Sequence, residues 1–181
     1  MSSEVFRTIG IDPGSRVTGI GVVEARGQSL HYIHSECVRV ETGSLGSRLV
    51  SIHQRIQEAI GRFQPASGAI EKVFVSANPQ SALVLGQARG SALLALAQSG
   101  LEVNEYSALE IKRAITGTGR AGKEQVQHMV RVLLSMDRKP PQDAADALAC
   151  AICHLHYAKV RQRQAAADAS VSAEDAGGPQ R

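Results

Sequence analysis

The hydrophobic positions of the first forty residues fall in short runs of the kind that form β-strands. Short runs rich in apolar residues occupy 6–11, 17–23 and 30–40. The first run ends at Asp12-Pro13-Gly14, a sequence typical of a tight turn. The pattern predicts three consecutive strands that form a meander.

From residue 45 the hydrophobic positions change to the 3.6-residue period of an α-helix, and Pro65 ends the series. The apolar positions of this helix are Leu45, Leu49, Ile52, Ile56, Ile60 and Phe63. A second helix is predicted to begin at Asn78-Pro79, an N-cap followed by proline in the first helical position, and to end at Gly100. The short apolar segments 69–75 and 101–106 are predicted to be strands on either side of it.

The rest of the folded chain is predicted to be helical. Ser107 is placed to cap a helix, and Glu110 completes a capping box three residues later. A glycine-rich loop at 117–122 separates this helix from another at 123–135, and a final helix is expected from about 142 to 159. Elements in this order indicate a mixed sheet with helices on its faces, which is an α/β domain.

Composition separates a folded part from a tail. The 181 residues fit one domain, and 43% hydrophobic residues suffice for a core. With 3% aromatic residues and no Trp, that core must be aliphatic and rich in alanine. From residue 161 onward the chain shows no periodicity and almost no large apolar residue. We therefore predict one folded domain at 1–160 and a disordered tail at 161–181.

The charge of the chain permits a nucleic-acid partner without requiring one. The formal net charge of +3 is only a mild basic excess. Between Ser107 and Lys139, seven Lys and Arg residues stand against three Asp and Glu residues, which fits either a DNA-binding face or an ordinary solvated helix surface. Three cysteines do not suggest a disulfide framework.

The targeting signals expected of exported or membrane proteins are not apparent. No apolar run approaches the roughly 20 residues that a membrane span needs. The segment from Met1 to Arg7 is polar and has no apolar signal-peptide core. A cytoplasmic location is therefore the default expectation.

Two acids belong to predicted strands, one at a strand end and one inside. Asp12 follows the first strand, where Asp-Pro-Gly also makes a turn without any further role. Glu71 interrupts an apolar segment predicted to be buried on both faces, and a buried carboxylate without a partner is costly. Glu71 therefore belongs either to a buried ion pair or to a functional site.

Two further acids share one face of the last predicted helix. Asp143 and Asp146 are three residues apart, and Asp143 also suits the first turn of a helix, where an acid favours the helix dipole. The alanines around Asp146 would let the helix approach the sheet closely. If the four acids converged, they would repel one another unless divalent cations such as Mg²⁺ or Mn²⁺ were bound between them. Two such ions can assist an in-line phosphoryl displacement.

Two other motifs are better explained as coincidences. Residues 117–123 resemble the start of a phosphate-binding loop, but Glu124 stands where such a loop needs Ser or Thr, and a helix is predicted before it. A cationic loop that touches phosphates is the better interpretation, with Arg120 and Lys123 at its end. The sequence Cys150-Ala-Ile-Cys153-His154 matches haem attachment but lies within an alanine-rich helix, and a zinc site there would lack a second pair of ligands.

Several segments of the chain, taken in order, resemble the signature segments of the RuvC family of Holliday junction resolvases. Each is weakly specific alone, but together they span about residues 9–156. They are Ile11-Asp12-Pro13-Gly14-Ser15-Arg16-Val17-Thr18-Gly19, Ile70-Glu71-Lys72-Val73-Phe74, Leu85-Gly86-Gln87-Ala88-Arg89-Gly90, Gln125-Val126-Gln127-His128-Met129-Val130 and Asp143-Ala144-Ala145-Asp146-Ala147-Leu148-Ala149.

The resemblance implies a ribonuclease H-like fold with a five-stranded mixed sheet, a homodimer, and a requirement for Mg²⁺, with Mn²⁺ as a substitute and two ions per site. The catalytic, metal-holding acids of the family fall on Asp12, Glu71, Asp143 and Asp146. The junction-wedging aromatic falls on Phe74, and two DNA-contacting lysines fall on Lys112 and Lys123. We add Arg89, from a matching segment, and Arg120, from the cationic loop, as expected DNA-binding residues.

The chain departs from the family pattern after Phe74, and the acids are untouched. The family usually has Met at position 75 and a basic residue near 77, often Ala-Asp at 79–80, and Lys at 84. This chain has Val75, Ala77, Pro79, Gln80 and Val84. These changes bear on how this edge contacts DNA.

We therefore expect a metal-dependent endonuclease that resolves four-way DNA junctions in recombination and repair, by paired nicks in strands of like polarity. A branch-migration motor is the expected partner. The main alternative is a non-catalytic junction-binding or nucleic-acid-binding protein on the same fold. A sugar-kinase or actin-like ATPase also begins with an Ile-Asp-x-Gly turn, but it needs a second domain for which this chain is too short.

Overall fold

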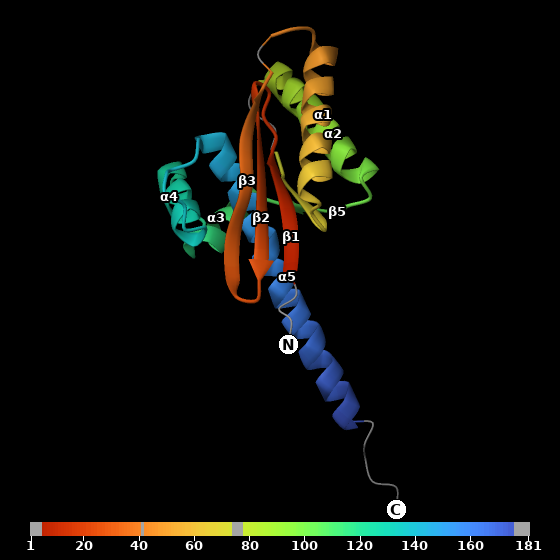
Figure 1. Ribbon diagram of the computed structural model, residues 1–181, viewed down its shortest axis with the longest axis vertical. Helices are drawn as coiled ribbons and strands as arrows, with labels where there is room; N and C mark the ends of the chain where they lie inside the picture. Colours follow the sequence, from red (N-terminus) through yellow and green to blue (C-terminus); the bar gives the residue numbers. More distant parts are fainter. Residues whose placement is uncertain (1–4, 41, 74–77, 176–181) are drawn as a thin grey trace, which may run out of the picture.

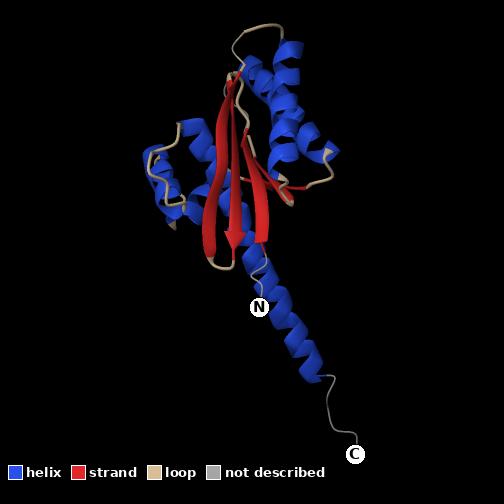
Figure 2. Ribbon diagram, in the orientation of Figure 1, coloured by secondary structure: helices blue, strands red, loops and turns tan. Residues whose placement is uncertain are grey.

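The protein, described here by a computed structural model, contains one five-stranded sheet with helices on both faces (Figures 1 and 2). The structure describes residues 5–40, 42–73 and 78–175, with only the backbone at 162, 163 and 165–175. The strand order across the sheet is β3-β2-β1-β4-β5. The strands are β1 (Val5–Asp12), β2 (Val17–Arg26), β3 (Ser29–Arg39), β4 (Ser67–Glu71) and β5 (Glu102–Tyr106).

The sheet is mixed, as the order of elements predicts. The first three strands form an antiparallel meander, whereas β4 runs parallel to β1, and β5 runs parallel to β4. The carboxyl ends of β1, β4 and β5 therefore meet at one edge of the sheet. Side chains that follow these strands are brought together there.

The helices form two layers with the sheet between them (Figure 1). On one face lie α1 (Leu45–Phe63) and α2 (Pro79–Gln98), which close one core over the sheet with residues such as Ile9, Ile52 and Leu96. On the other face lie α3 (Ala108–Thr116), α4 (Lys123–Leu133) and α5 (Gln142–Asp175), which close a second core. Both cores are mainly aliphatic and rich in alanine, as the composition predicts.

Local signals set the ends of the helices. Asn78 caps α2 through its side-chain oxygen, and Ser107 and Glu110 form the predicted capping box at the start of α3. Gly117 ends α3 in the left-handed region, with φ of 76°, where glycine has no steric penalty.

Helix α5 packs unusually close to β1 and β2 because three glycines form the surface beneath it. A Cβ built on Gly19 would stand 2.0 Å from the carbonyl oxygen of Asp143, and one on Gly10 would stand 2.2 Å from that of Ala147. A Cβ on Gly21 would stand 2.6 Å from the Leu148 nitrogen. Glycine in a strand often marks such a close backbone approach. This contact fixes where the first turns of α5 lie on the sheet.

The predicted strand at 69–75 is too long at its carboxyl end. Strand β4 ends at Glu71, which is paired with Tyr106, the last residue of β5. Lys72 still donates its backbone N–H to the Tyr106 carbonyl at 2.8 Å, and there is no strand residue beyond Tyr106 to pair with Val73. Glu71 therefore lies at a strand end and not inside a strand.

The backbone of 161–175 is helical, where the sequence predicted an irregular tail. Helix α5 continues to Asp175, and Figure 1 shows its last part projecting beyond the sheet. Alanine is abundant in this segment and has the highest helix propensity, which favours continuation of the helix without a packing partner. That the folded domain ends near residue 160 remains a prediction. Within the described residues, no helix is long and apolar enough to cross a membrane.

Candidate active site

Two acids lie side by side where parallel strands end. Asp12 is the last residue of β1, and Glu71 is the last residue of β4. The register pairs Ile11 with Ile70, so the two acids follow the final pair of the ladder. The strand pattern had predicted Asp12 at a strand end and Glu71 within a strand, and the parallel pairing of the observed strands brings the two to the same edge.

Helix α5 brings the other two acids to this edge. Asp143 and Asp146 occupy its first turns, and the close packing on Gly19 holds the Asp143 backbone against β2. The neighbouring alanines, Ala144, Ala145 and Ala147, are buried, whereas both acids are only half-buried. The close packing of this alanine-rich helix on the sheet is as predicted, and that both carboxylates serve one site remains a prediction.

Gln142 holds the Asp146 carboxylate. Its side-chain amide nitrogen lies 3.0 Å from Oδ1 and 3.1 Å from Oδ2 of Asp146 and donates to both. The two residues are four apart on α5, so they share a helix face. This contact orients the carboxylate.

The acids open into a small hollow that also contains lysines. The hollow has a volume of about 210 Å³ and is lined by Asp12, Glu71, Asp146, Lys112 and Lys123, among others. Lys112 comes from α3, and Lys123 begins α4. Both predicted DNA-contacting lysines therefore face the same hollow as three of the four predicted acids.

Burial and mutual repulsion make Asp12 reluctant to ionise. Burial raises the pKa of Asp12 to about 8, and the charges of Glu71, Asp146 and Asp143 contribute to the increase. The charge of Lys123 opposes it. Asp143 does not line the hollow, but its effect on Asp12 shows that it belongs to the same electrostatic cluster.

Glu71 and Asp146 are shifted in the same direction. Burial raises the pKa of Glu71, and the charge of Asp146 raises it further. Burial also raises the pKa of Asp146, against the hydrogen bond from Gln142 and the charge of Lys123. Three neighbouring carboxyl groups therefore have raised pKa values, in each case mainly through burial, and the two lysines do not reverse the shifts.

The side chains as they stand do not form a closed set of metal ligands. Within residues 5–40, 42–73 and 78–175, no three His, Cys, Asp or Glu side chains are grouped tightly enough to enclose an ion. The donor chemistry nevertheless fits a hard divalent cation, because the hollow offers carboxylate oxygens and no sulfur or imidazole. A bound cation would also offset the mutual repulsion of these carboxylates once they ionise.

The other expected DNA-binding residues are placed differently. Arg120 is exposed in the loop between α3 and α4, outside the acidic hollow. Arg89, on α2, forms an ion pair with Glu105 of β5 and is mostly buried. Phe74, Val75 and Ala77 lie outside the described residues. Their roles remain predictions.

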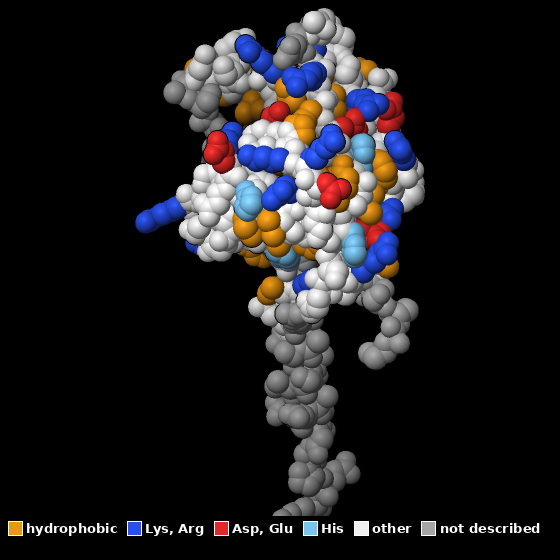
Figure 3. All heavy atoms as spheres, turned by 60° about the vertical axis from the view of Figure 1, so that its left-hand side comes forward, with side chains coloured by type: hydrophobic (Ala, Val, Ile, Leu, Met, Phe, Trp, Pro, Cys, Tyr) orange, Lys and Arg blue, Asp and Glu red, His pale blue; other side chains and the backbone are white. Residues whose placement is uncertain are grey.

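Basic side chains are spread over the face of the molecule that carries α3 and α4. Figure 3 shows this face, where Lys and Arg side chains are more frequent than Asp and Glu side chains and are interleaved with hydrophobic ones. This distribution agrees with the excess of cations counted between Ser107 and Lys139.

The motifs interpreted as coincidences have structural explanations. Cys150 and Cys153 are fully buried in the core beneath α5, where neither could attach a haem. His154 is buried as well, and its Nδ1 lies 2.9 Å from the Tyr106 hydroxyl. The glycine-rich loop follows helix α3 and not a strand, so it lacks the setting of a nucleotide-binding loop.

Three features of the site were missed in the sequence. The spacing of Gln142 and Asp146 was a signal for their hydrogen bond. Gly10, Gly19 and Gly21 inside predicted strands were a signal for the close approach of α5. No sequence signal placed Cys37 near the acids. Burial raises the pKa of its thiol, and the charges of Asp143 and Asp12 raise it further.

The chain is similar to a family of junction-cleaving enzymes along most of its length. The family model for the crossover junction endodeoxyribonuclease RuvC matches residues 8–154, a span that contains all four acids. The crossover junction endodeoxyribonuclease RuvC of Marinobacter nauticus is 52% identical over 148 residues, covering 82% of this chain and 85% of that protein. The corresponding protein of Alkalilimnicola ehrlichii is 51% identical over 157 residues, covering 87% and 95%.

Solved structures agree with this similarity. The Thermus thermophilus RuvC structure in complex with a Holliday junction substrate matches with a TM-score of 0.81 and 35% identity, covering 86% of this chain and 96% of that one. The yeast mitochondrial Holliday junction resolvase matches with a TM-score of 0.60 and 12% identity, covering 82% of this chain and 77% of that one. The second likeness concerns the fold alone.

Proposed function

Because this chain belongs to the RuvC family of Holliday junction resolvases, we propose that it hydrolyses a phosphodiester bond at the crossover of a four-way DNA junction, with Asp12, Glu71, Asp143 and Asp146 as its metal-holding acids. One observation carries the assignment of the site. Acids from β1, β4 and α5 meet at one edge of the sheet, in and around a hollow that also contains two lysines.

The acids are suited to Mg²⁺, for which Mn²⁺ is a chemically similar substitute, and four carboxylates are enough for two ions. When bound, such ions supply an activated water and stabilise the charge that develops on the phosphate. Asp12, Glu71, Asp143 and Asp146 would hold such ions, and Asp146 would then share between Gln142 and the metal the carboxylate oxygens that accept from Gln142. Because the pKa values of Asp12 and Glu71 are raised, this binding releases protons.

The lysines have a separate task. Lys112 and Lys123 reach the hollow from α3 and α4 and carry the charge that a phosphate needs beside four acids. Their charges also lower the pKa of Glu71 and of Asp146, which keeps those carboxylates closer to their ionised, metal-binding form. We assign them to the phosphates adjacent to the bond that is cleaved.

A homodimer is supported by an exposed face of α2 that carries no charge. Leu83 and Leu94 have exposed fractions of 57% and 52%, and the exposed glycines Gly86 and Gly90 lie between them on this face. Small residues allow a second helix to approach closely. A two-fold symmetric dimer matches the approximate symmetry of a four-way junction and presents two identical sites, as paired nicks in strands of like polarity require.

The non-catalytic alternative explains the site less well. A protein that only bound DNA would gain nothing from acids that are costly to bury and that repel phosphate. We place the enzyme in the cytoplasm with its DNA substrate and expect a branch-migration motor to act with it.

A cleavage assay tests this function. A four-way junction and a linear duplex of the same sequences are incubated with the purified protein in Mg²⁺, in Mn²⁺ and in EDTA. We expect symmetric nicks near the crossover of the junction with either metal, no product in EDTA, and little cleavage of the duplex. Equal cleavage of both substrates, or binding of the junction without metal-dependent nicking, contradicts the proposal.

A further inference from the structure

A second hollow lies at the same edge of the sheet, on the side of α1 and α2. It has a volume of about 430 Å³ and is lined by Ser15, Arg16, Arg48, Gln80, Ser81 and Val84. Ser15 and Arg16 follow Asp12 by only three and four residues, in the turn that joins β1 to β2. Gln80 and Val84 are two of the positions at which the chain departs from the family pattern.

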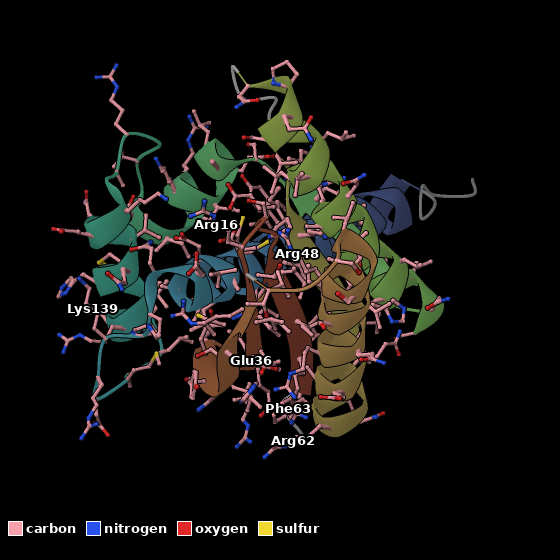
Figure 4. The ribbon with its side chains drawn as sticks, turned by 90° about the horizontal axis from the view of Figure 1, so that it is seen from above. Arg16, Glu36, Arg48, Arg62, Phe63 and Lys139 are labelled. Carbon is pink, nitrogen blue, oxygen red and sulfur yellow. The ribbon has the colours of Figure 1, made fainter. Side chains whose placement is uncertain are left out.

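The lining of this hollow is cationic. It includes two arginines and, within the described chain, no acid. Figure 4 looks down on this edge and shows Arg16 and Arg48 near each other, while Arg62 lies well apart at the margin. Arg16 is exposed and makes no side-chain hydrogen bond or ion pair with another described residue.

Arg48 is held in place but retains donors. One terminal nitrogen of its guanidinium donates to the Ser15 carbonyl, which ties α1 to the β1–β2 turn. The Nε–H is buried and has no acceptor in the part of the chain that the structure describes. A buried unpaired donor costs about 1–3 kcal/mol, so this is a guanidinium with unsatisfied hydrogen-bonding capacity.

The start of α2 adds positive potential but no free backbone donors. The Asn78 side chain already accepts from the backbone N–H groups of Gln80 and Ser81, at 3.0 and 3.4 Å. The partial positive charge of the helix N-terminus remains and favours an anion in front of it. The hydroxyls of Ser15 and Ser81 are further donors that line the hollow. The recognition chemistry is therefore that of two guanidinium groups for a phosphate.

From these observations we infer that the Arg16–Arg48 hollow binds a phosphodiester group of the junction, on the opposite side of the Asp12 turn from Lys112 and Lys123. The inference rests on the proposed function, since it extends the DNA path across the acidic site. Four acids repel the strand that they must cleave, and cations on both sides of them hold that strand in place. The hollow thus binds a strand on the α1–α2 side of the molecule. The basic residues counted on α3 and α4 lie on the other face of the sheet and do not contact that strand.

Salt-dependent binding tests the inference without any cleavage. Junction binding is measured in EDTA over a series of salt concentrations for the wild type, Arg16→Gln, Arg16→Lys and the distant control Arg62→Gln. One lost phosphate contact reduces the log–log salt slope by about 0.9. We expect that reduction for Arg16→Gln only, with unchanged thermal unfolding, since Arg16 is exposed and unpaired within the described residues.

Uncharged phosphates locate the contact. Junctions that carry a single methylphosphonate at successive positions near the crossover are bound to the wild type and to Arg16→Gln. We expect one position at which the substitution weakens wild-type binding but does not weaken Arg16→Gln binding any further. The inference is overturned if methylphosphonate substitution and Arg16→Gln weaken binding additively at every position. It is also overturned if Arg16→Gln keeps the wild-type salt slope. The same holds if Arg16→Gln weakens the binding of inorganic phosphate but not that of the junction. If the wild type neither binds nor nicks junctions, the proposed function fails first.

Discussion

At the residue scale, the most unusual group is Asp12, whose pKa is raised to about 8, mainly by burial. A raised pKa means that the folded protein holds this proton more tightly than the unfolded chain does, where the pKa is 3.8. The resulting stabilisation is fully present below the lower value and is lost as the pH rises toward the higher one. At neutral pH the folded protein keeps Asp12 largely protonated although the unfolded chain releases this proton, and this difference lowers the stability of the metal-free fold.

The first prediction concerns how the stability of Asp12→Asn depends on pH. In EDTA, the free energy of unfolding of Asp12→Asn should increase relative to that of the wild type as the pH rises from about 4 to about 8. Because the Asn side chain cannot ionise, the variant lacks the loss of stability with rising pH that Asp12 causes in the wild type. Chemical denaturation at several pH values measures the difference. Gly61→Ala changes no ionisable group and should show a constant difference. A constant difference for Asp12→Asn as well contradicts the account.

The second prediction concerns Lys123, whose charge lowers the pKa of Asp12, Glu71 and Asp146. In Lys123→Ala these carboxyl groups should hold their protons to higher pH. The acid limb of the pH–rate profile for junction nicking should therefore shift upward, while Lys123→Arg should remain near the wild-type profile. An unchanged limb in Lys123→Ala means that Lys123 binds DNA without tuning the acids.

The functional residues could be predicted from the sequence only in part. Asp12 was recognised because it ends a strand at a turn, and Asp146 because its acid interrupts a run of alanines. That these acids lie together could not be derived from spacing, since they are far apart in the chain, and it came from the family resemblance. The Gln142 contact was missed because its partner was considered only as a metal ligand.

At the scale of elements, the site depends on how close α5 lies to the sheet. Gly19→Ala places a methyl group 2.0 Å from the Asp143 carbonyl oxygen. This oxygen belongs to the backbone, which cannot move aside as easily as the end of a flexible side chain, so α5 itself must shift. We predict a loss of about 3 kcal/mol or more in the free energy of unfolding, together with slower nicking by the protein that remains folded.

Gly61→Ala is the matched control for this third prediction. Gly61 lies in α1, and a Cβ there meets nothing within 4 Å. Alanine should stabilise that helix by about 0.5–1 kcal/mol. Chemical denaturation measures the free energy of unfolding of both variants. Equal stability of Gly19→Ala and the wild type means that α5 does not sit against β2 as described.

The elements themselves were largely predictable, because periodicity and capping are local properties. The bounds of α1 were predicted correctly, as was the capping box of α3. The carboxyl end of β4 was not, because it depends on where its partner β5 ends. The helical continuation of α5 to Asp175 was missed because the lack of an apolar stripe was taken as a lack of structure. Glycines inside strands, such as Gly10, Gly19 and Gly21, indicate that some backbone approaches closely, but that the approaching element is α5 is a tertiary property that no local pattern shows.

At the scale of the whole molecule, paired nicking requires two sites and hence the proposed dimer. The fourth prediction is that Leu94→Glu, on the uncharged face of α2, weakens dimerisation at least about tenfold, because the charge would be buried between the two copies. Sedimentation measures the shift toward monomer. Val132→Glu, at a residue of α4 with a similar exposed fraction of 50%, should remain dimeric. If both variants behave alike, the α2 face is not the interface.

The central claim is that the acids at the edge of the sheet form the nuclease centre, and Glu71→Gln tests it most directly. The variant keeps the size of the side chain and removes one charge from a crowded site, so folding and metal-free junction binding should hold. The measurement is the single-turnover nicking rate of a bound four-way junction in Mg²⁺. We predict a loss of several kcal/mol of transition-state stabilisation, about a thousandfold or more in rate. Nicking at the wild-type rate by fully folded Glu71→Gln contradicts the account.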